Sequence, residues 1–157
     1  MSVETTGTST APQALPAVVQ DFLLLVGRVL LGWIFVQSGW RKLMDMEAFI
    51  TTSPTSLVKR GVPGASFWGW IGAPLEFVGG LLILIGCATR YAAFAILIFT
   101  IAATLIGHRY WEFTNPAEYR AQHTQFFKNV SMMGGTMVLI VAGAGRWALD
   151  WMLWRKR

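Results

Sequence analysis

Charged side chains are scarce in this sequence: only 13% of its 157 residues are Asp, Glu, Lys or Arg, whereas 54% are hydrophobic. A typical soluble domain carries about 25% charged residues. A chain this short cannot keep so much apolar surface away from water in a single core. The composition therefore excludes an ordinary soluble domain and indicates that a lipid bilayer is the solvent.

Cysteine, histidine and cofactor motifs are equally scarce. The single cysteine, Cys87, excludes an internal disulfide or a CxxC redox pair, and we expect it to fill space beside a turn. The two histidines, His108 and His123, lack a nearby carboxylate triad, so we expect neither a metal site nor a haem ligand set. No dinucleotide fingerprint is present. Any redox chemistry therefore needs a bound small molecule or a partner protein.

Four apolar runs are long enough to cross about 30 Å of hydrocarbon, which takes about 20 helical residues. They lie at about 21–42, 67–86, 91–108 and 126–145. Because a backbone in lipid must satisfy its own hydrogen bonds, these runs are predicted to be helices. We therefore expect an all-α, integral membrane four-helix bundle over 21–150.

The remaining segments are predicted from their composition. Residues 1–20 are rich in Thr, Ser, Ala and Pro and are expected to form a disordered tail, while 151–157 form a basic interfacial tail. The link around 87–90 predicts an antiparallel hairpin. Residues 44–63 are expected to form an interfacial segment and a turn, and 109–125 a polar loop.

The positive charge of +5 points to lipid headgroups and not to nucleic acid, because the basic residues lie between apolar runs and form no separate basic stripe. An even number of spans places both termini on one side. The Lys and Arg counts of the two sides nearly cancel, and we expect cytoplasmic termini in a bacterial inner membrane.

Two ionisable residues lie deep in the predicted spans. From the helical rise, Arg28 is roughly 9 Å and Glu76 roughly 15 Å from the side of the termini. Such charges normally face the bundle interior and find a partner, so we expect an Arg28–Glu76 pair that serves chemistry or simply fixes helix register. Small and charged residues share one face of each helix, and we predict that these faces meet: Arg28, Gly32, Phe35, Gly39 and Lys42 on the first, and Gly72, Glu76, Gly79 or Gly80, and Ile83 on the second.

A second polar layer is expected near the opposite interface. It contains Lys42, His108, Lys128 and Asn129, which together with His123 and Glu112 from the loop would line a pocket open to the far face. Simpler interpretations remain open. The two lysines are close enough to the interface to extend into the headgroups, and His108 is placed to cap a helix end.

The pattern of these residues resembles the DoxX family. It begins with Arg28, Gly32, Phe35, Ser38-Gly39 and Lys42, an R-x3-G-x2-F-x2-SG-x2-K pattern, and continues with Glu76-Phe-Val-Gly-Gly, Gly86, Thr89-Arg90 and His108. Phe126-Phe-Lys-Asn129 and Gly143-Ala-Gly-Arg-Trp-Ala-Leu-Asp150 complete it; Ala144 and Ala148 stand where many relatives have Pro and Ser. The resemblance implies a four-span inner-membrane protein, a subunit that works with a membrane quinone or a small thiol.

Three functions are consistent with the sequence. The first is an oxidoreductase subunit with quinone as a conceivable cofactor, the second a non-catalytic anchor for a partner protein or a second copy, and the third a small-solute carrier. The candidate site residues are, for catalysis, Arg28, Glu76, His108 and Lys128; for binding, Lys42 and Asn129; and for structure, Gly32, Gly39, Gly79, Gly80, Arg90, Arg146 and Asp150.

Overall fold

A computed structural model describes residues 15–53 and 55–154 of the chain. The described residues form four long helices: α1 (Ala17–Met44), α2 (Ala65–Ile85), α3 (Thr89–Gly107) and α4 (Pro116–Ala142). Three short elements join or follow them: a π-helical turn η1 (Ala48–Thr52), a 3-10 turn η2 (Tyr110–Glu112) and the helix α5 (Leu149–Trp154). Residues 1–14 of the expected tail lie outside the described residues, and α1 begins about one turn before the predicted span.

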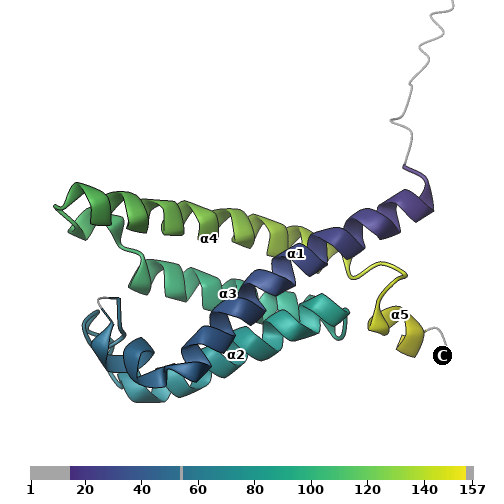
Figure 1. The fold of residues 1–157 in the computed structure, drawn as a ribbon. Coiled ribbons are helices and arrows are strands. Elements are labelled where there is room, and N and C mark those ends of the chain that lie inside the picture. Colours follow the sequence, from purple (N-terminus) through teal and green to yellow (C-terminus); the bar gives the residue numbers. More distant parts are fainter. Residues whose placement is uncertain (1–14, 54, 155–157) are drawn as a thin grey trace, which may run out of the picture.

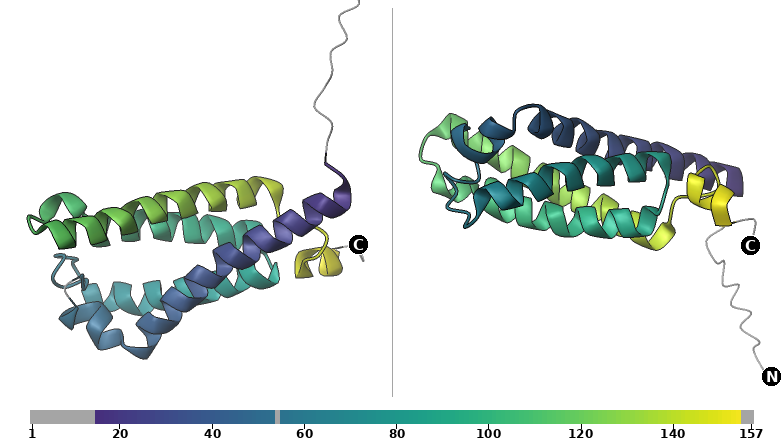
Figure 2. Two further views of the ribbon diagram at one scale, coloured as in Figure 1. Left: turned by 45° about the horizontal axis from the view of Figure 1, so that its top comes forward. Right: turned by 90° about the horizontal axis from the view of Figure 1, so that it is seen from below.

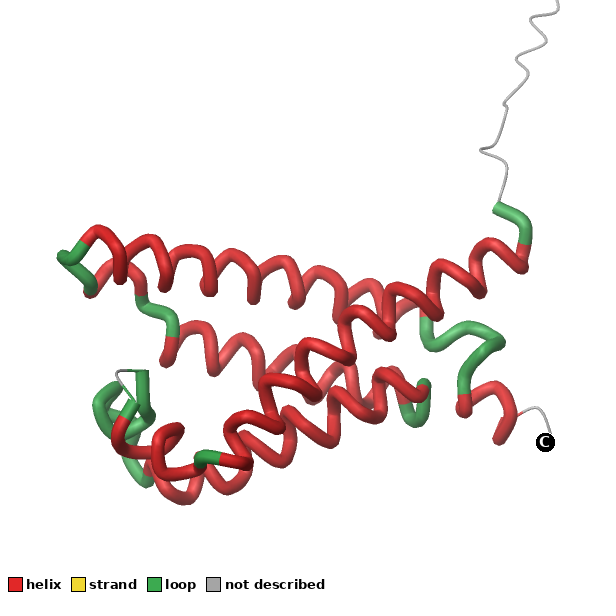
Figure 3. The backbone as a smooth tube through the Cα atoms, viewed as in Figure 1, coloured by secondary structure: helices red, strands yellow, loops and turns green. Residues whose placement is uncertain are grey.

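The long helices run side by side and their connections gather at two ends (Figure 1). We name the end formed by 45–64 and 108–115 the loop end, and the end formed by the 86–88 turn and residues 143–154 the termini end. Figure 2 shows that α1 and α2 diverge from α3 and α4 towards the loop end, and Figure 3 shows the connecting segments that close each end. Both described chain ends lie at the termini end, as an even number of spans requires.

The outward faces of the bundle are apolar. Large hydrophobic side chains are exposed along every long helix, including Leu30 at 68% and Val141 at 79%. Such a surface would be unfavourable in water and is the expected one in lipid. Within the described residues, three segments are long and apolar enough to cross a membrane: Ala17–Met44, Ala65–Ile85 and Thr89–Glu112. The fourth helix, α4, is less apolar because its first turns carry polar side chains, yet it completes the bundle beside α3.

Glycines allow α1 and α2 to pack almost backbone to backbone, as predicted. A methyl group added at Gly39 would lie 2.5 Å from the backbone nitrogen of Phe77, and one added at Gly32 would lie 2.8 Å from the carbonyl oxygen of Gly80. Gly72, which was predicted for this contact, and Gly79 face α3 instead: an added methyl group would lie 3.2 Å from the ring of Phe99 at Gly72 and 2.8 Å from the side chain of Ile96 at Gly79. Gly79 and Gly80 therefore let α2 approach a different helix on each side.

The predicted connection between the second and third spans is confirmed. The antiparallel hairpin is present: the 86–88 turn uses the left-handed conformation at Gly86 (φ 73°) and Ala88 (φ 47°).

The predicted polar loop 109–125 is wrong, because α4 already begins at Pro116. Asn115 caps this helix by accepting a hydrogen bond from the Ala117 nitrogen at 2.9 Å, and proline is favoured at the first helical position. The cap at Asn115 and the proline at 116 therefore start a helix here, although the composition of the segment is polar.

We predict that Gly39→Ala destabilises the bundle by about 1–3 kcal/mol, because the new methyl group forces α1 away from the α2 backbone. Gly27→Ala is the matched control on the same helix, since nothing lies within 4 Å of a methyl group at that position. Thermal unfolding in detergent measures both variants. Equal melting temperatures for the two would contradict the close contact.

Candidate functional site

The predicted pair of Arg28 and Glu76 is wrong. Arg28 donates from Nη1 to the Leu84 carbonyl oxygen at 3.1 Å and from Nη2 to the Trp147 carbonyl oxygen. The antiparallel contact of Gly32 with Gly80 and Leu84 explains this, because it places Arg28 beside the end of α2. The last carbonyls of a helix lack partners within the helix and carry partial negative charge. Leu84 lies eight residues from Glu76, roughly 12 Å along the axis.

Other charged residues at the termini end also bind backbone groups of helix ends. The carboxylate of Asp150 accepts hydrogen bonds from the nitrogens of Ala88 (2.6 Å) and Thr89 (2.9 Å), at the start of α3. Arg90 donates to the carbonyl oxygen of Val141 at 3.2 Å, at the end of α4. These contacts hold the segment after α4 against the α2–α3 turn.

Asp21 adds a contact from the first turns of α1 that sequence reasoning missed. Its carboxylate accepts hydrogen bonds from the backbone nitrogen of Arg146 at 2.9 Å and from the Arg146 side-chain Nε at 2.6 Å. Arg146 is therefore joined to α1, while its neighbour Trp147 is joined to Arg28 on the same helix. The charged side chains at this end therefore hold the helices and the connecting segments together.

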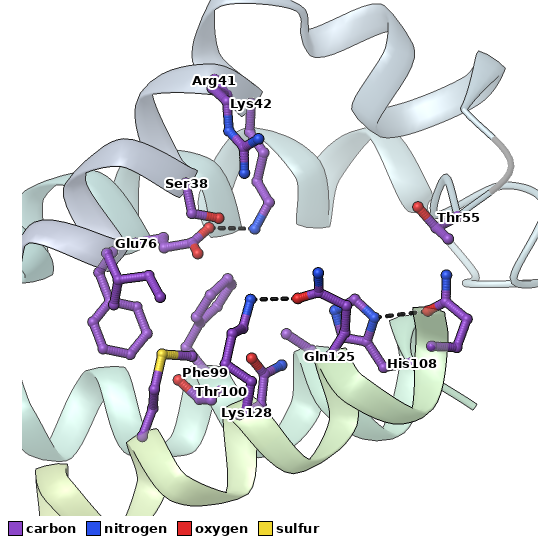
Figure 4. Close-up of a pocket in the computed structure, with 16 residues that line it drawn as sticks. Ser38, Arg41, Lys42, Thr55, Glu76, Phe99, Thr100, His108, Gln125 and Lys128 are labelled. Atoms are coloured by element: carbon purple, nitrogen blue, oxygen red, sulfur yellow. Dashed lines mark hydrogen bonds and ion pairs between the residues drawn. The ribbon is translucent and has the colours of Figure 1, made fainter. Parts of the chain in front are cut away.

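A polar cavity of about 310 Å³ lies at the loop end, where the two helix pairs diverge. Every long helix contributes to its wall, and the residues that line it are Ile34, Phe35, Ser38, Arg41, Lys42, Thr55, Glu76, Phe99, Thr100, Ala103, His108, Gln122, Gln125, Lys128, Asn129 and Met132. Four of the residues predicted for the second polar layer are among them: Lys42, His108, Lys128 and Asn129. Figure 4 shows Lys42 and Lys128 extending into the cavity from opposite sides.

Glu76 pairs with Lys42 on one side of this cavity. The Glu76 side chain is 6% exposed and that of Lys42 is 26% exposed. The Lys42 ammonium also lies 5.2 Å from the ring centre of Phe49 and 5.5 Å from that of Phe99, within cation–π range. The buried carboxylate thus has its cation, and the two aromatic rings lie close to the ammonium.

The α3–α4 side of the cavity supplies neutral hydrogen-bonding groups and a second lysine. The Lys128 ammonium donates to the amide oxygen of Gln125, and Nδ1 of His108 lies 2.9 Å from the Gln122 amide oxygen. Nδ2 of Asn129 donates to Oγ1 of Thr104 at 2.9 Å, which joins α4 to α3. Among the residues that line the cavity, Arg41, Lys42 and Lys128 are cationic and Glu76 is the acidic one, so positive charge is in excess.

Two residues predicted for this layer lie elsewhere. His123 packs in an aromatic cluster, with its ring centre 4.6 Å from that of Phe127 and 5.0 Å from that of Tyr110. Glu112 pairs with Arg60 and Arg109, each at 3.1 Å. Neither histidine belongs to a group of three or more His, Cys, Asp or Glu side chains suited to a metal within the described segments.

Sequence reasoning missed several lining residues, most of all on α4. Gln122 and Gln125 lie about one helical turn apart and face the cavity beside Asn129, which was predicted. The helical spacing of the two glutamines is visible in the sequence, but both lie in the segment 109–125, for which a loop was predicted. Arg41 also lines the cavity and was not among the predicted site residues.

Known proteins share the sequence pattern of this chain. Residues 23–109 match the family described as DoxX. The chain belongs to the DoxX family. It is 30% identical to the inner membrane protein YphA of Escherichia coli over 82% of this chain and 88% of that protein. It is 31% identical to YqjF, also an inner membrane protein of Escherichia coli, over 88% of this chain and 97% of that protein.

A third relative is the uncharacterized membrane protein Rv3486 of Mycobacterium tuberculosis, which is 27% identical over 78% of this chain and 76% of that protein. No solved structure matches significantly. The apolar helices and the inner-membrane relatives agree: this DoxX-family chain is a multi-pass protein of the bacterial inner membrane.

We predict that Lys42→Met destabilises the bundle by about 3–5 kcal/mol, because it leaves the Glu76 carboxylate buried without a cation. The double variant with Glu76→Leu is expected to melt at a higher temperature than Lys42→Met alone. A double-mutant cycle in detergent measures this coupling.

Arg28→Met combined with Glu76→Leu is the matched control cycle. Its effects are expected to add within about 0.5 kcal/mol, because the two side chains share no partner. Strong coupling in this cycle, with additivity in the Lys42 cycle, would reverse the assignment of the ion pair.

Proposed function

We propose that this DoxX-family protein is the membrane subunit of an oxidoreductase and binds a quinone head group, or a small thiol, in the cavity at the loop end. The proposal rests on the position of the Lys128 ammonium. It extends into the cavity opposite the Lys42–Glu76 pair, and its hydrogen-bond partner in the described chain is the neutral amide of Gln125. A second ammonium in a half-enclosed site favours a ligand with electron-rich oxygen or sulfur.

The cavity suits a small ligand. Its volume of about 310 Å³ is at the lower end of the range for small-molecule sites, about 300–1,000 Å³, which fits one ring and not a large cofactor. Phe35 and Phe99 supply apolar and aromatic wall, against which a planar ring can pack. The donor groups of Lys42 and Lys128 face this space from opposite sides, as the two carbonyl oxygens of a quinone require.

The residues of the chain have separate roles in this proposal. Lys42 and Lys128 donate hydrogen bonds to the ligand and stabilise negative charge on its oxygens. Glu76 lies against Lys42 and accepts or supplies a proton, a role that a carboxylate within reach of the reacting group performs in general acid–base catalysis. His108, held by Gln122 through Nδ1, presents its other ring nitrogen as a further proton acceptor.

The electrons come from outside the chain in this proposal, because its sequence has one cysteine and no cofactor fingerprint. A quinone takes up two electrons and two protons to become a quinol. Oxidation of two thiols to a disulfide releases the same numbers. A thiol, free or on a partner protein, is therefore a sufficient reductant, and in this proposal Glu76 and His108 move the protons.

The proposal is tested by quinone binding to the purified protein in detergent. We expect a short-chain ubiquinone to bind with one site per chain, and Lys128→Met to weaken binding about tenfold or more, the loss expected when a charged hydrogen-bond donor is removed. Binding is followed by quenching of tryptophan fluorescence. Lys59→Met is the matched control, since Lys59 is exposed in the loop and lies outside the cavity.

The alternative functions give different results. If no quinone or thiol binds and a partner protein co-purifies with wild type and Lys128→Met alike, the chain is an anchor and the redox proposal fails. If a small solute crosses sealed vesicles in proportion to the amount of protein, the carrier hypothesis replaces it.

A further inference from the structure

A second hollow lies at the termini end, far along the helices from the cavity just described. It is a groove of about 790 Å³ between the α2–α3 turn, the segment that follows α4, and α5. Two arginines, Arg90 and Arg146, line it together with the exposed apolar side chains of Tyr91, Trp151 and Leu153. The groove therefore combines two guanidinium groups with an apolar wall.

Both guanidinium groups keep hydrogen-bond donors free for a ligand. A guanidinium has five N–H donors. The described contacts of Arg90 use one donor of Nη2, to Val141, and those of Arg146 use its Nε, to Asp21. Arg90 is exposed and the Arg146 side chain is 47% exposed, so the remaining donors are accessible from the groove.

The one acidic residue that lines the groove, Asp150, forms its hydrogen bonds with the backbone. Asp150 directs both carboxylate oxygens to the backbone nitrogens of Ala88 and Thr89, at the start of α3. Among the residues that line the groove, two arginines face one carboxylate, which leaves one positive charge in excess and favours an anion. Planar guanidinium groups bind phosphate particularly well.

The position of the groove decides which phosphate compound fits. It lies where α2 and α4 end and α3 begins, which is the depth of the lipid headgroups for helices that cross the bilayer. Tyr91, 82% exposed, and Trp151, 44% exposed, are residue types that prefer this interface. Leu153, 58% exposed, extends the apolar wall that acyl chains need.

We propose that this groove binds an anionic phospholipid, with the phosphate held by Arg90 and Arg146 and the acyl chains against Tyr91, Trp151 and Leu153. Basic pockets at the ends of transmembrane helices bind such headgroups in other membrane proteins. The bound lipid would bridge the α2–α3 turn and the segment after α4, which the Asp150 and Arg90 contacts already join.

The test is lipid retention by the full-length protein, measured by native mass spectrometry in detergent with phosphatidylglycerol or phosphatidylcholine added. Wild type is expected to retain phosphatidylglycerol preferentially. Arg90→Gln is expected to lower this preference about fivefold, the equivalent of about 1 kcal/mol for one cationic side chain at an anionic surface. Arg120→Gln, an equal charge change in the exposed first turns of α4, is the control and is expected to leave the preference unchanged.

A second pair of variants keeps the arginine contacts intact. Tyr91→Glu places a carboxylate at the groove and is expected to abolish the preference, whereas the neutral Tyr91→Gln retains it. Equal retention of both lipids by wild type, or equal loss in Arg90→Gln and Arg120→Gln, would overturn the proposal. Displacement of phosphatidylglycerol by soluble glycerol phosphate at similar concentration would assign the groove to a free phosphate compound and overturn the lipid assignment.

Discussion

The close contact between α1 and α2 is the constraint on which the rest of this structure depends. Glycines at 32, 39 and 80 let the two backbones approach until an added methyl group would overlap the opposite helix. This contact fixes the register of the two helices. Lys42 then meets Glu76, whereas Arg28 reaches the last carbonyls of α2. Small residues at a helix–helix interface thus decide which charges form pairs inside the membrane.

The two ends of the bundle use charged residues for different purposes. At the termini end, Arg28, Arg90 and Asp150 bind backbone groups at helix ends, and Asp21 binds Arg146. These interactions join segments far apart in the sequence and hold the end of the bundle together, although Arg90 and Arg146 keep further donors exposed. At the loop end, the helix pairs diverge around a cavity in which the cations outnumber the one lining carboxylate. The excess of positive charge around this cavity is the reason for regarding the loop end as the candidate functional site.

Much of the fold could be predicted from the sequence, because hydrophobic length and the position of glycines are local signals. The hairpin around Gly86 followed from the short link between two apolar runs. Helical spacing predicted that the α1 and α2 faces meet, and the helical rise predicted that Lys42, His108 and Lys128 lie at one level. The start of α4 was missed, because the cap at Asn115 competes with a polar composition that is also typical of loops. The partner of Glu76 was not predicted: depth from the helical rise favoured Arg28, whereas the glycine contacts place Arg28 beside Leu84, roughly 12 Å further along α2, and bring Lys42 to Glu76.

The central claim is that the loop-end cavity is accessible to water and carries excess positive charge. In a Cys87→Ser background, Ser38→Cys places a thiol on the cavity wall. We measure its reaction with an anionic and a cationic methanethiosulfonate, each rate divided by the rate with a free thiol. The account predicts that the anionic reagent reacts several-fold faster than the cationic one, and that Lys128→Met removes this preference. A cysteine at the outward-facing position Val138 is expected to react with neither reagent. An unreactive Ser38→Cys, or a preference for the cationic reagent, would contradict it.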